Sequence, residues 1–470
     1  MTECKQKTFD FHPLQQRKVV ARFDGGNITS DAGAMLLRET DLRTGILAQF
    51  AACFKDYRDQ ELIEHTVLQL VKQRVYGLAL GYEDLNDHDQ LRADPLLAVL
   101  LDHPDPLGTQ RRNERDQGKA LAGKSTLNRL ELTPADADAK SRYQKIVYNK
   151  KAIEDLFVEL FLQAHTAPPK EILLDLDATD DPLYGEQEGR FFHGYYKEYC
   201  YLPLYIFCGE HLLCARLRPA NIDGAAGALK QVQRIVALIR KKWPLVRIIL
   251  RGDSGFCREH LMAWCESQGV FYIFGLAKNV RLEKELSLEM GQAQVAFEHT
   301  QQAARVFKDF IYQTLHSWSC ARRVVGKAEY LEKGANPRYV VTNFSAQEQA
   351  AQTLYEDTYC ARGEMENRIK EQQLYLFADR TSTATMRANQ LRLWFSSMAY
   401  VLMHALRRLG LKGTDLETAQ CQTIRLKLLK IGAQIKVTVR KVWLSLAEGY
   451  PYKRIFAEVF GRLQAIPLRC

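Results

Sequence analysis

The sequence lacks closely spaced cysteine pairs, long apolar runs and internal repeats. Its 11 cysteines are scattered with no C-x-x-C pair, which argues against a zinc ribbon and against a secreted disulfide scaffold. No run of about 18 apolar residues is present, so we expect no membrane-spanning helix and no membrane partner. The first residues, MTECKQKTFDFHPLQQRK, are too polar for a signal peptide. We therefore expect a cytoplasmic protein whose thiols are reduced.

Acidic residues are scarce at one end of the chain. The formal net charge is +9, and residues 421–470 contain ten lysines and arginines but only two acidic residues. A local excess of positive charge favours a polyanion partner, because binding releases condensed counterions. A solvated basic helix face would have the same composition, so charge alone leaves both interpretations open.

The pattern of apolar residues changes near the Pro-containing segment 164–170. Before it, apolar residues recur mostly at helical spacing. After it, short strand-like runs alternate with helices, which predicts a mixed sheet flanked by helices. Residues 285–345 are again rich in strand-like runs, and a long helix is expected from about residue 350 to 377. The expected strands of the sheet are residues 171–179, 199–207, 211–219, 245–253 and 270–277.

Acidic side chains lie at the ends of two of these strands. Alternation puts Asp175 and Asp177 of EILLDLDAT on one strand face. Asp253 of RIILRGDSGF follows its strand directly. In open α/β sheets, ligands bind at the carboxyl ends of the strands. A single aspartate at such a place is more often a cap or turn residue, but two at facing strand ends favour a functional site.

The long helix carries a third acidic candidate in YCARGEMENRIKEQQ (359–373). At 100° per residue, one arc of about 80° contains Tyr359, Arg362, Glu366, Lys370 and Gln373. One helix face thus presents a carboxylate between two cations and a tyrosine. Ion pairs at i,i+4 spacing would produce the same pattern, and periodicity alone favours that interpretation.

The three motifs together resemble the acidic triad of DDE transposases with an RNase H-like core. Asp177-Ala178-Thr179 resembles the first motif, and Gly252 to Phe256 (GDSGF) the second. Tyr359, Arg362 and Glu366 resemble the Y-x2-R-x3-E-x6-K signature, whose last position here is Gln373, so we expect Lys370 to supply that charge. The chain is similar to the insertion-sequence 4 superfamily, most closely to the insertion-sequence 1380 family. SDAGAMLLRE, TLNRLE, HGYYKEYCYLPLYIF and RYVVTNF extend the resemblance over nearly the whole chain.

The resemblance implies a site for two Mg²⁺ ions, for which Mn²⁺ can substitute. Asp177 would bridge both ions, and Asp253 and Glu366 would each hold one. Asp175 shares the strand face with Asp177 but lacks the following x-Thr, so we favour Asp177 over it. Tyr359, Arg362 and Lys370 would contact DNA phosphates. Such a site cleaves DNA with water as the first nucleophile, and the released 3′-OH then attacks the target.

The resemblance also implies the fold class and domain organisation: an α/β protein with an RNase H-like mixed-sheet core. A mostly helical DNA-binding region precedes the core, a β-strand insertion interrupts it, and a basic helical region follows it. The expected function is cut-and-paste transposition by a homodimer on paired transposon ends, associated with the nucleoid when bound to DNA. The expected boundaries are 1–165 (N-terminal region), 166–284 (first core part), 285–345 (insertion), 346–410 (second core part with Glu366) and 411–470 (C-terminal region).

A different motif, GKALAGKST (118–126), matches G-x-x-x-x-G-K-[ST]. A phosphate-binding loop joins a buried strand to a helix N-terminus, and the preceding residues RRNERDQ cannot form that strand. We interpret the match as accidental and expect Ser125 or Thr126 to cap a short helix. Arg112 and Lys124, in a stretch that also contains Arg111, Arg115 and Lys119, predict contact with a DNA backbone.

Two alternative functions fit parts of the sequence. One is a catalytically silent DNA-binding protein, against which the intact trio of acidic residues argues. The other is a P-loop ATPase using Gly118–Ser125, against which the missing strand argues. Among further candidates, His193 is expected to pack or contact phosphate, Trp264 and Trp394 to lie in the core, and Trp318 to be available for stacking on a DNA base.

Overall fold

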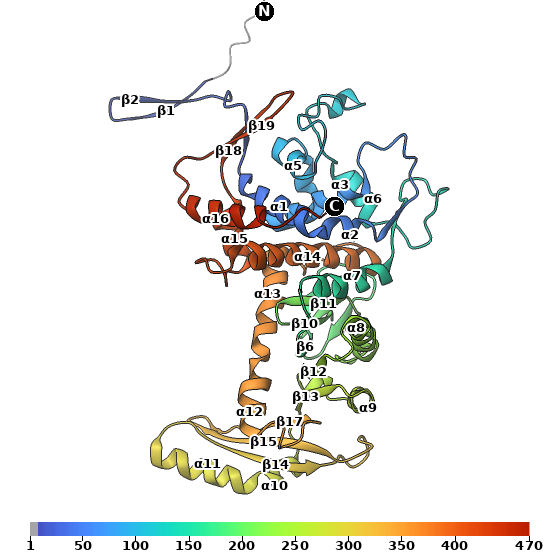
Figure 1. Cartoon of the computed structure of the whole chain (residues 1–470), viewed down its shortest axis with the longest axis vertical. Helices are drawn as coiled ribbons and strands as arrows, with labels where there is room; N and C mark the ends of the chain where they lie inside the picture. The colour runs from blue at the N-terminus through green and yellow to red at the C-terminus, as the bar shows by residue number, and fades with distance from the viewer. Residues whose placement is uncertain (1–7, 470) are drawn as a thin grey trace, which may run out of the picture. The chain divides into compact units, whose positions relative to one another are not determined.

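The computed structural model describes residues 8–469, and the chain divides into two compact units (Figure 1). The first unit combines Met1–Tyr148 with Met398–Cys470, and the second is Asn149–Ser397. The two ends of the chain therefore contribute to the same unit. None of the helices within residues 8–469 is both long and apolar enough to cross a membrane.

The second unit is built on a nine-stranded sheet in the order β11-β10-β6-β12-β13-β17-β15-β14, with β16 paired to β15. β12 lies parallel to β6 and β13, and the other pairs are antiparallel. The predicted mixed sheet is confirmed. Its strands are β6 (Glu171–Ala178), β10 (Leu204–Cys208), β11 (His211–Arg216), β12 (Arg247–Gly252), β13 (Phe271–Leu276), β14 (Ala304–Tyr312), β15 (Arg322–Leu331), β16 (Gly334–Ala335) and β17 (Arg338–Thr342).

Helices cover the sheet because alternate strand residues are apolar on each face. On one face, Leu174, Leu250 and Phe274 are fully buried in a core that also contains residues of α7, α8 and α9. α8 contributes Val232, Ile235 and Ile239, whose spacing of three and four residues forms a single apolar stripe. Figure 1 shows α8 and α9 on one side of the strands and α13 on the other. The helices are α7 (Lys150–Gln163), α8 (Ala228–Lys242), α9 (Glu259–Ser267) and α13 (Gly363–Leu376).

Helix α10 (Val280–Glu285) leads up to the segment predicted to be β-rich, and that segment begins with helix α11 (Ser287–Thr300) rather than a strand. Its strands β14, β15 and β17 follow, and they extend the same sheet beyond β13. A small separate sheet in this unit is formed by β7 (Asp181–Pro182), β9 (Glu198–Tyr201) and β8 (Phe191–His193). The single strand expected over residues 199–207 is thus two strands in two sheets, separated at Leu202 and Pro203.

The long helix expected from about residue 350 to 377 is not regular. It begins as α12 (Ala351–Thr353), continues as a π-helical turn over Leu354–Tyr359 and a 3₁₀ turn over Cys360–Arg362, and ends as α13. The residues between Tyr359 and α13 form a 3₁₀ turn, in which successive residues are about 120° apart rather than 100°. Tyr359 and Glu366 therefore do not keep the regular α-helical relation on which the predicted common arc rests.

The first unit is mostly helical in its N-terminal part, and its C-terminal part contains strands. β3 (Asn27–Thr29), β18 (Ala433–Val437) and β19 (Val442–Leu446) form a sheet in the order β19-β18-β3. The prediction of a helical C-terminal region is wrong there, because Ala433 and Ile435 alternate inward and β3 supplies a pairing strand from far away in the sequence. The remaining major elements are β1 (Phe9–Leu14), β2 (Arg17–Ala21), α1 (Met35–Thr44), α2 (Ile46–Ala51), β4 (Phe54–Asp56), α3 (Val67–Leu80), α4 (His88–Leu91), α5 (Pro95–Leu100), α6 (Lys124–Glu131), β5 (Ile146–Tyr148), α14 (Met386–Leu406, which crosses the unit boundary), α15 (Cys421–Ile424) and α16 (Lys453–Gln464).

Candidate active site

Two neighbouring parallel strands place Asp177 and Asp253 at one edge of the sheet. Asp177 is the penultimate residue of β6, and Asp253 follows the last residue of β12. Gly252 of β12 lies opposite Leu176 of β6, so the two carboxylates begin at nearly the same height. Asp253 also caps the 3₁₀ turn after β12, where its Oδ1 accepts a hydrogen bond of 2.8 Å from the Gly255 amide. Both strand ends thus present a carboxylate at the edge where α/β proteins bind ligands.

The third acidic residue, Glu366, reaches the same place from α13. Asp177, Asp253 and Glu366 line one cleft of about 670 Å³. They come from segments separated by 76 and 113 residues, as the sequence numbers give. Glu366 is more accessible than Asp177, with 43% of its side chain exposed against 15%. The structure therefore brings the three predicted carboxylates together.

Arg362 lies between two of these carboxylates. Its Nη2 is 2.7 Å from Oε1 of Glu366, and its Nη1 is 3.5 Å from Oδ1 of Asp177. The first contact is the i,i+4 ion pair that periodicity favours, and the second joins the helix to the strand end. The guanidinium is thus the counterion that both carboxylates share.

Burial, together with neighbouring carboxylates, raises the pKa of Asp177 to about 7. Burial is the largest cause, because it penalises the charged form, and the nearby carboxylates of Asp253 and Glu366 act in the same direction. Arg362 opposes the shift only in part. Near neutral pH this carboxyl is accordingly poised between its protonated and ionised forms.

Carboxylate oxygens are the ligands that Mg²⁺ prefers, so the donor chemistry of the cleft fits this ion. Their present arrangement is not a closed coordination shell. Within residues 8–469, no group of three His, Cys, Asp or Glu side chains lies close enough together to hold a metal ion. The ion pairs of Arg362 with Asp177 and Glu366 account for part of this spacing, because the guanidinium lies between the two acids.

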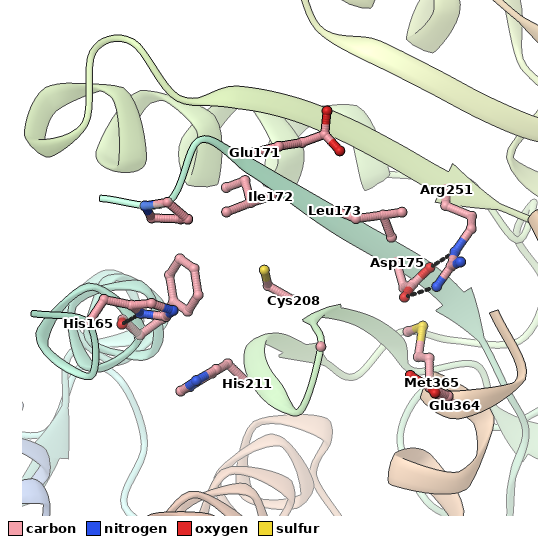
Figure 2. A pocket seen from close by; sticks show the side chains of 13 residues that line it. His165, Glu171, Ile172, Leu173, Asp175, Cys208, His211, Arg251, Glu364 and Met365 are labelled. Atoms are coloured by element: carbon pink, nitrogen blue, oxygen red, sulfur yellow. Dashed lines mark hydrogen bonds and ion pairs between the residues drawn. The ribbon is translucent and has the colours of Figure 1, made fainter. Parts of the chain in front are cut away.

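Asp175, the competing acidic residue of β6, forms a buried ion pair. Its two carboxylate oxygens accept from Nε and Nη2 of Arg251 at 2.5 and 2.8 Å, as Figure 2 shows. Both side chains are about 5% exposed. Burial raises the pKa of Asp175, and Arg251 counteracts this. Asp175 lines a different cavity, of about 300 Å³, together with Leu173 and Met365.

We predict that Asp175→Ala destabilises the fold without removing a residue of the carboxylate cleft. The substitution leaves the guanidinium of Arg251 buried without its carboxylate, which costs about 3–5 kcal/mol in comparable cases. Urea unfolding monitored by circular dichroism measures the loss. The double variant Asp175→Leu, Arg251→Met is the control, because replacing both charges with apolar groups of similar size restores most of the stability. Equal stability of Asp175→Ala and the wild type would contradict this assignment.

Tyr359 lies in a second cleft rather than beside Glu366. This cleft has a volume of about 540 Å³ and shares Asp253 and Ser254 with the first. A Cβ at position 275 would stand 2.6 Å from the Tyr359 hydroxyl, so the close approach of this ring to β13 requires Gly275. Burial raises the pKa of Tyr359, with a contribution from Asp253. The tyrosine of the third motif therefore borders the aspartate of the second.

Lys370 and Gln373 both line the carboxylate cleft. The Gln373 amide donates a hydrogen bond of 2.9 Å to the backbone oxygen of Asp180. Lys370 lies one turn after Glu366, is exposed, and forms no ion pair with any residue of the described part of the chain. The lysine of the signature is thus absent from position 373, and a free lysine is present one turn earlier in the helix.

Sequence reasoning missed several residues of the cleft. Tyr195 and Tyr196 line it, as does Asp180. The Tyr196 hydroxyl is 3.4 Å from the backbone oxygen of Ala178, and its ring contacts His193 at a centroid distance of 4.9 Å. The signal that could have found them is HGYYK, which belongs to the segments that carry the family resemblance.

The structure confirms the predicted environment for some of the three tryptophans considered above and not for others. Trp394 is fully buried, as predicted, and its Nε1 donates to the backbone oxygen of Ala215. Trp264 is half-buried against the core. The interpretation of Trp318 as free to stack on a base is wrong: it is 7% exposed and packs edge-on against Tyr312. The pairing of β14 with β15 brings the residues that cover it, which local sequence does not reveal.

In the first unit, the two predicted DNA-contacting residues are held by neighbouring groups. The Lys124 ammonium is 3.2 Å from Oδ1 of Asn86 and 3.5 Å from Asp89. The Arg112 guanidinium donates to the backbone oxygens of Glu61 and Leu62. Neither lines the basic cleft of about 680 Å³ nearby. The cations that line that cleft are Arg58, Arg92, Arg111, Arg115, Lys119 and Arg129.

The GKALAGKST motif does not form a nucleotide-binding loop. The last strand before Gly118 in the described chain is β4, more than sixty residues earlier. The amide of Lys124 already donates to Oδ1 of Asp89 at 3.0 Å, so a carboxylate occupies the first turn of α6. The predicted caps, Ser125 and Thr126, are wrong, since α6 begins at Lys124 with Gly123 as its N-cap.

Comparisons with known proteins address the family directly. None of the curated proteins compared with the chain matches it. Among solved structures, a piggyBac transposase synaptic complex with hairpin DNA, determined by cryo-EM, aligns with a TM-score of 0.40 and 10% identity. The alignment covers 85% of this chain and 80% of that one. The family model described as transposase DDE domain, group 1, matches residues 11–468. Because this match spans nearly the whole chain, the protein belongs to the group 1 family of transposase DDE domains.

Proposed function

We propose that this transposase binds the terminal inverted repeats of its own insertion sequence and moves the element by cutting and joining DNA. We also propose an RNase H-like catalytic core of the insertion-sequence 4 superfamily, closest to the insertion-sequence 1380 family. The observation that supports the proposal most strongly is the convergence of Asp177, Asp253 and Glu366, from three distant segments, on one cleft. DNA is the substrate, a homodimer on paired ends is the acting form, and the nucleoid is the place of action.

Phosphodiester cleavage and strand transfer are in-line displacements at phosphorus. Divalent ions bound at such a site would supply the charge that activates the attacking oxygen and stabilises the leaving one. Asp177, Asp253 and Glu366 would hold them, with Mg²⁺ as the ion and Mn²⁺ able to substitute. The Asp177 carboxylate lies within the electrostatic influence of both Asp253 and Glu366, which supports a shared cation site for the three acids.

The other residues of the cleft would position DNA. Arg362 neutralises Asp177 and Glu366 in the free protein. When cations are bound by these acids, its guanidinium would be free to pair with a phosphate, for which its planar, doubly donating geometry is suited. Tyr359, on the other side of Asp253, and Lys370 would contact phosphates next to the scissile one. In the first unit, the basic cleft near Arg112 and Lys124 would contact the DNA backbone.

An end-cleavage assay tests the proposal. The substrate is a DNA duplex that contains the inverted repeats flanking the gene, incubated with the full chain and Mg²⁺ or Mn²⁺. We expect nicks at the ends of the repeats, followed by joining to a second duplex. Binding to this DNA without cleavage under either metal would instead support the alternative of a catalytically silent DNA-binding protein.

Removal of the free lysine in the carboxylate cleft gives a further prediction. Lys370→Ala is expected to weaken binding of end DNA, with a decrease of about 0.9 in the slope of log K against log salt, since one phosphate contact is lost. The double variant Lys370→Gln, Gln373→Lys returns the lysine to the signature position and is expected to restore the binding and the salt slope. Titrations at several salt concentrations measure the slope. An unchanged slope for Lys370→Ala would exclude Lys370 as a phosphate contact.

A further inference from the structure

A basic β-hairpin in the first unit protrudes with its charges unpaired. β18 and β19 pair from Ala433↔Leu446 to Val437↔Val442. The hairpin carries Lys436, Arg440 and Lys441, and none of these cations forms an ion pair with any residue of 8–469. The sequence from Ile431 to Ala447 contains no acidic residue. This element therefore has an uncompensated charge of +3.

The tip of the hairpin is fixed by hydrogen bonds rather than loose. Thr438 and Lys441 close a two-residue loop: the Thr438 amide donates to the Lys441 oxygen at 2.8 Å, and the Lys441 amide donates to the Thr438 hydroxyl at 3.0 Å. The base is anchored, because Ala433 and Ile435 are buried and β3 pairs with β18 along its other edge. A rigid, anchored ribbon loses little conformational entropy when it binds a partner.

Apolar groups are exposed on the same hairpin. Val439 at the tip is fully exposed, and Trp443 is 56% exposed. The Lys441 ammonium lies 5.2 Å from the centre of the Trp443 ring, and Lys436 is paired opposite Trp443 across the strands. Lysines on an edge strand commonly serve only to prevent aggregation. That role gives no reason to expose a tryptophan and a valine between the cations.

We infer that the β18–β19 hairpin is a DNA-binding wing that inserts its tip into a groove of duplex DNA. A two-stranded ribbon has the dimensions of a groove reader. Lys436, Arg440 and Lys441 meet phosphates along the groove walls, and Trp443 packs against the exposed sugar or base surface. A second copy of the chain is a poorer partner for this face, since two such hairpins would bring six unpaired cations together. The inference rests on the proposed function and assigns a DNA-contacting element to it.

The test measures binding of the full chain to a labelled duplex of about three helical turns. The triple variant Lys436→Ala, Arg440→Ala, Lys441→Ala is expected to reduce the slope of log K against log salt by about 2 to 3, at about 0.9 per phosphate contact. The matched control, Lys230→Ala, Lys241→Ala, Lys242→Ala, removes the same charge from exposed positions of α8 in the second unit. Its slope is expected to stay at the wild-type value. A decrease as large in the control would overturn the inference, because it would reflect net charge alone.

Trp443 provides an independent readout. Of the five tryptophans, all within the described residues, only Trp443 is exposed. We expect DNA to quench tryptophan emission, and we expect the variant Trp443→Phe to lose most of that quenching. Trp443→Ala should bind DNA roughly tenfold more weakly with an unchanged salt slope.

If the wild type binds DNA and the triple variant binds it equally well with the same salt slope, the hairpin is not a DNA-binding wing, although the proposed function stands. Absence of DNA binding by the wild type would refute the proposed function as well. A change in sedimentation of the triple variant, with unaltered DNA binding, would assign the hairpin to self-association instead.

Discussion

Asp253→Asn is expected to abolish cleavage of transposon-end DNA while leaving the fold and DNA binding intact. Asparagine has nearly the same shape, and its Oδ1 can still accept the hydrogen bond from Gly255 that caps the turn after β12. It has no negative charge with which to hold a divalent cation. Loss of several kcal/mol of charge stabilisation in the transition state corresponds to a rate decrease of at least about 10³-fold.

The measurement is single-turnover cleavage in Mg²⁺ with protein in excess over DNA, so that binding does not limit the rate. Glu366→Gln should behave in the same way as Asp253→Asn. Glu364→Gln is the matched control, because Glu364 lies two residues away on α13 and lines the other cavity with Asp175. Cleavage by Asp253→Asn within tenfold of the wild type, at equal DNA binding, would remove Asp253 from the catalytic site.

Short-range sequence patterns were sufficient for the parts of the site that lie on strands. Asp177 and Asp253 follow apolar runs with strand character, and parallel pairing of β6 with β12 is enough to bring their carboxylates to one edge. The helical position of Glu366 was predictable for the same reason, since α13 is regular from Gly363. Tyr359 was misplaced because it ends a π-helical turn and a 3₁₀ turn separates it from α13, and nothing in the local pattern marks these departures from the α-helix.

Features that depend on pairing between segments far apart in the sequence could not be predicted from local patterns. Trp318 is buried by strands that pair across the insertion, and β18 depends on β3, four hundred residues before it. The alternation of Ala433, Ile435 and Val437 was present in the sequence but was outweighed there by the basic composition. Arg362 makes one contact of each kind. Its i,i+4 ion pair with Glu366 is local and could be predicted, whereas its contact with Asp177 follows only from the packing of α13 beside β6.

The second prediction with a large effect concerns how the stability of the metal-free protein depends on pH through Asp177. Its pKa is raised from 3.8 to about 7 by burial and by its acidic neighbours. Between these two values the folded state holds a proton that the unfolded state has released, so rising pH favours unfolding across that window. At about 1.4 kcal/mol per pKa unit, the carboxylate costs the metal-free protein a few kcal/mol above pH 7. Asparagine at position 177 does not titrate and avoids this cost.

We therefore expect Asp177→Asn to be more stable than the wild type in the absence of metal, by an amount that grows from about pH 4 to pH 7 and then levels off. Urea unfolding in EDTA at several pH values measures the difference, and subtraction of the two proteins cancels the titration of groups that do not interact with Asp177. Mg²⁺ should reverse the order at pH 8, because only the carboxylate gains from binding the ion, and binding to the wild type should weaken as pH falls below 7. A constant difference between Asp177→Asn and the wild type would mean that the carboxyl is fully ionised throughout, and that Arg362 alone neutralises it.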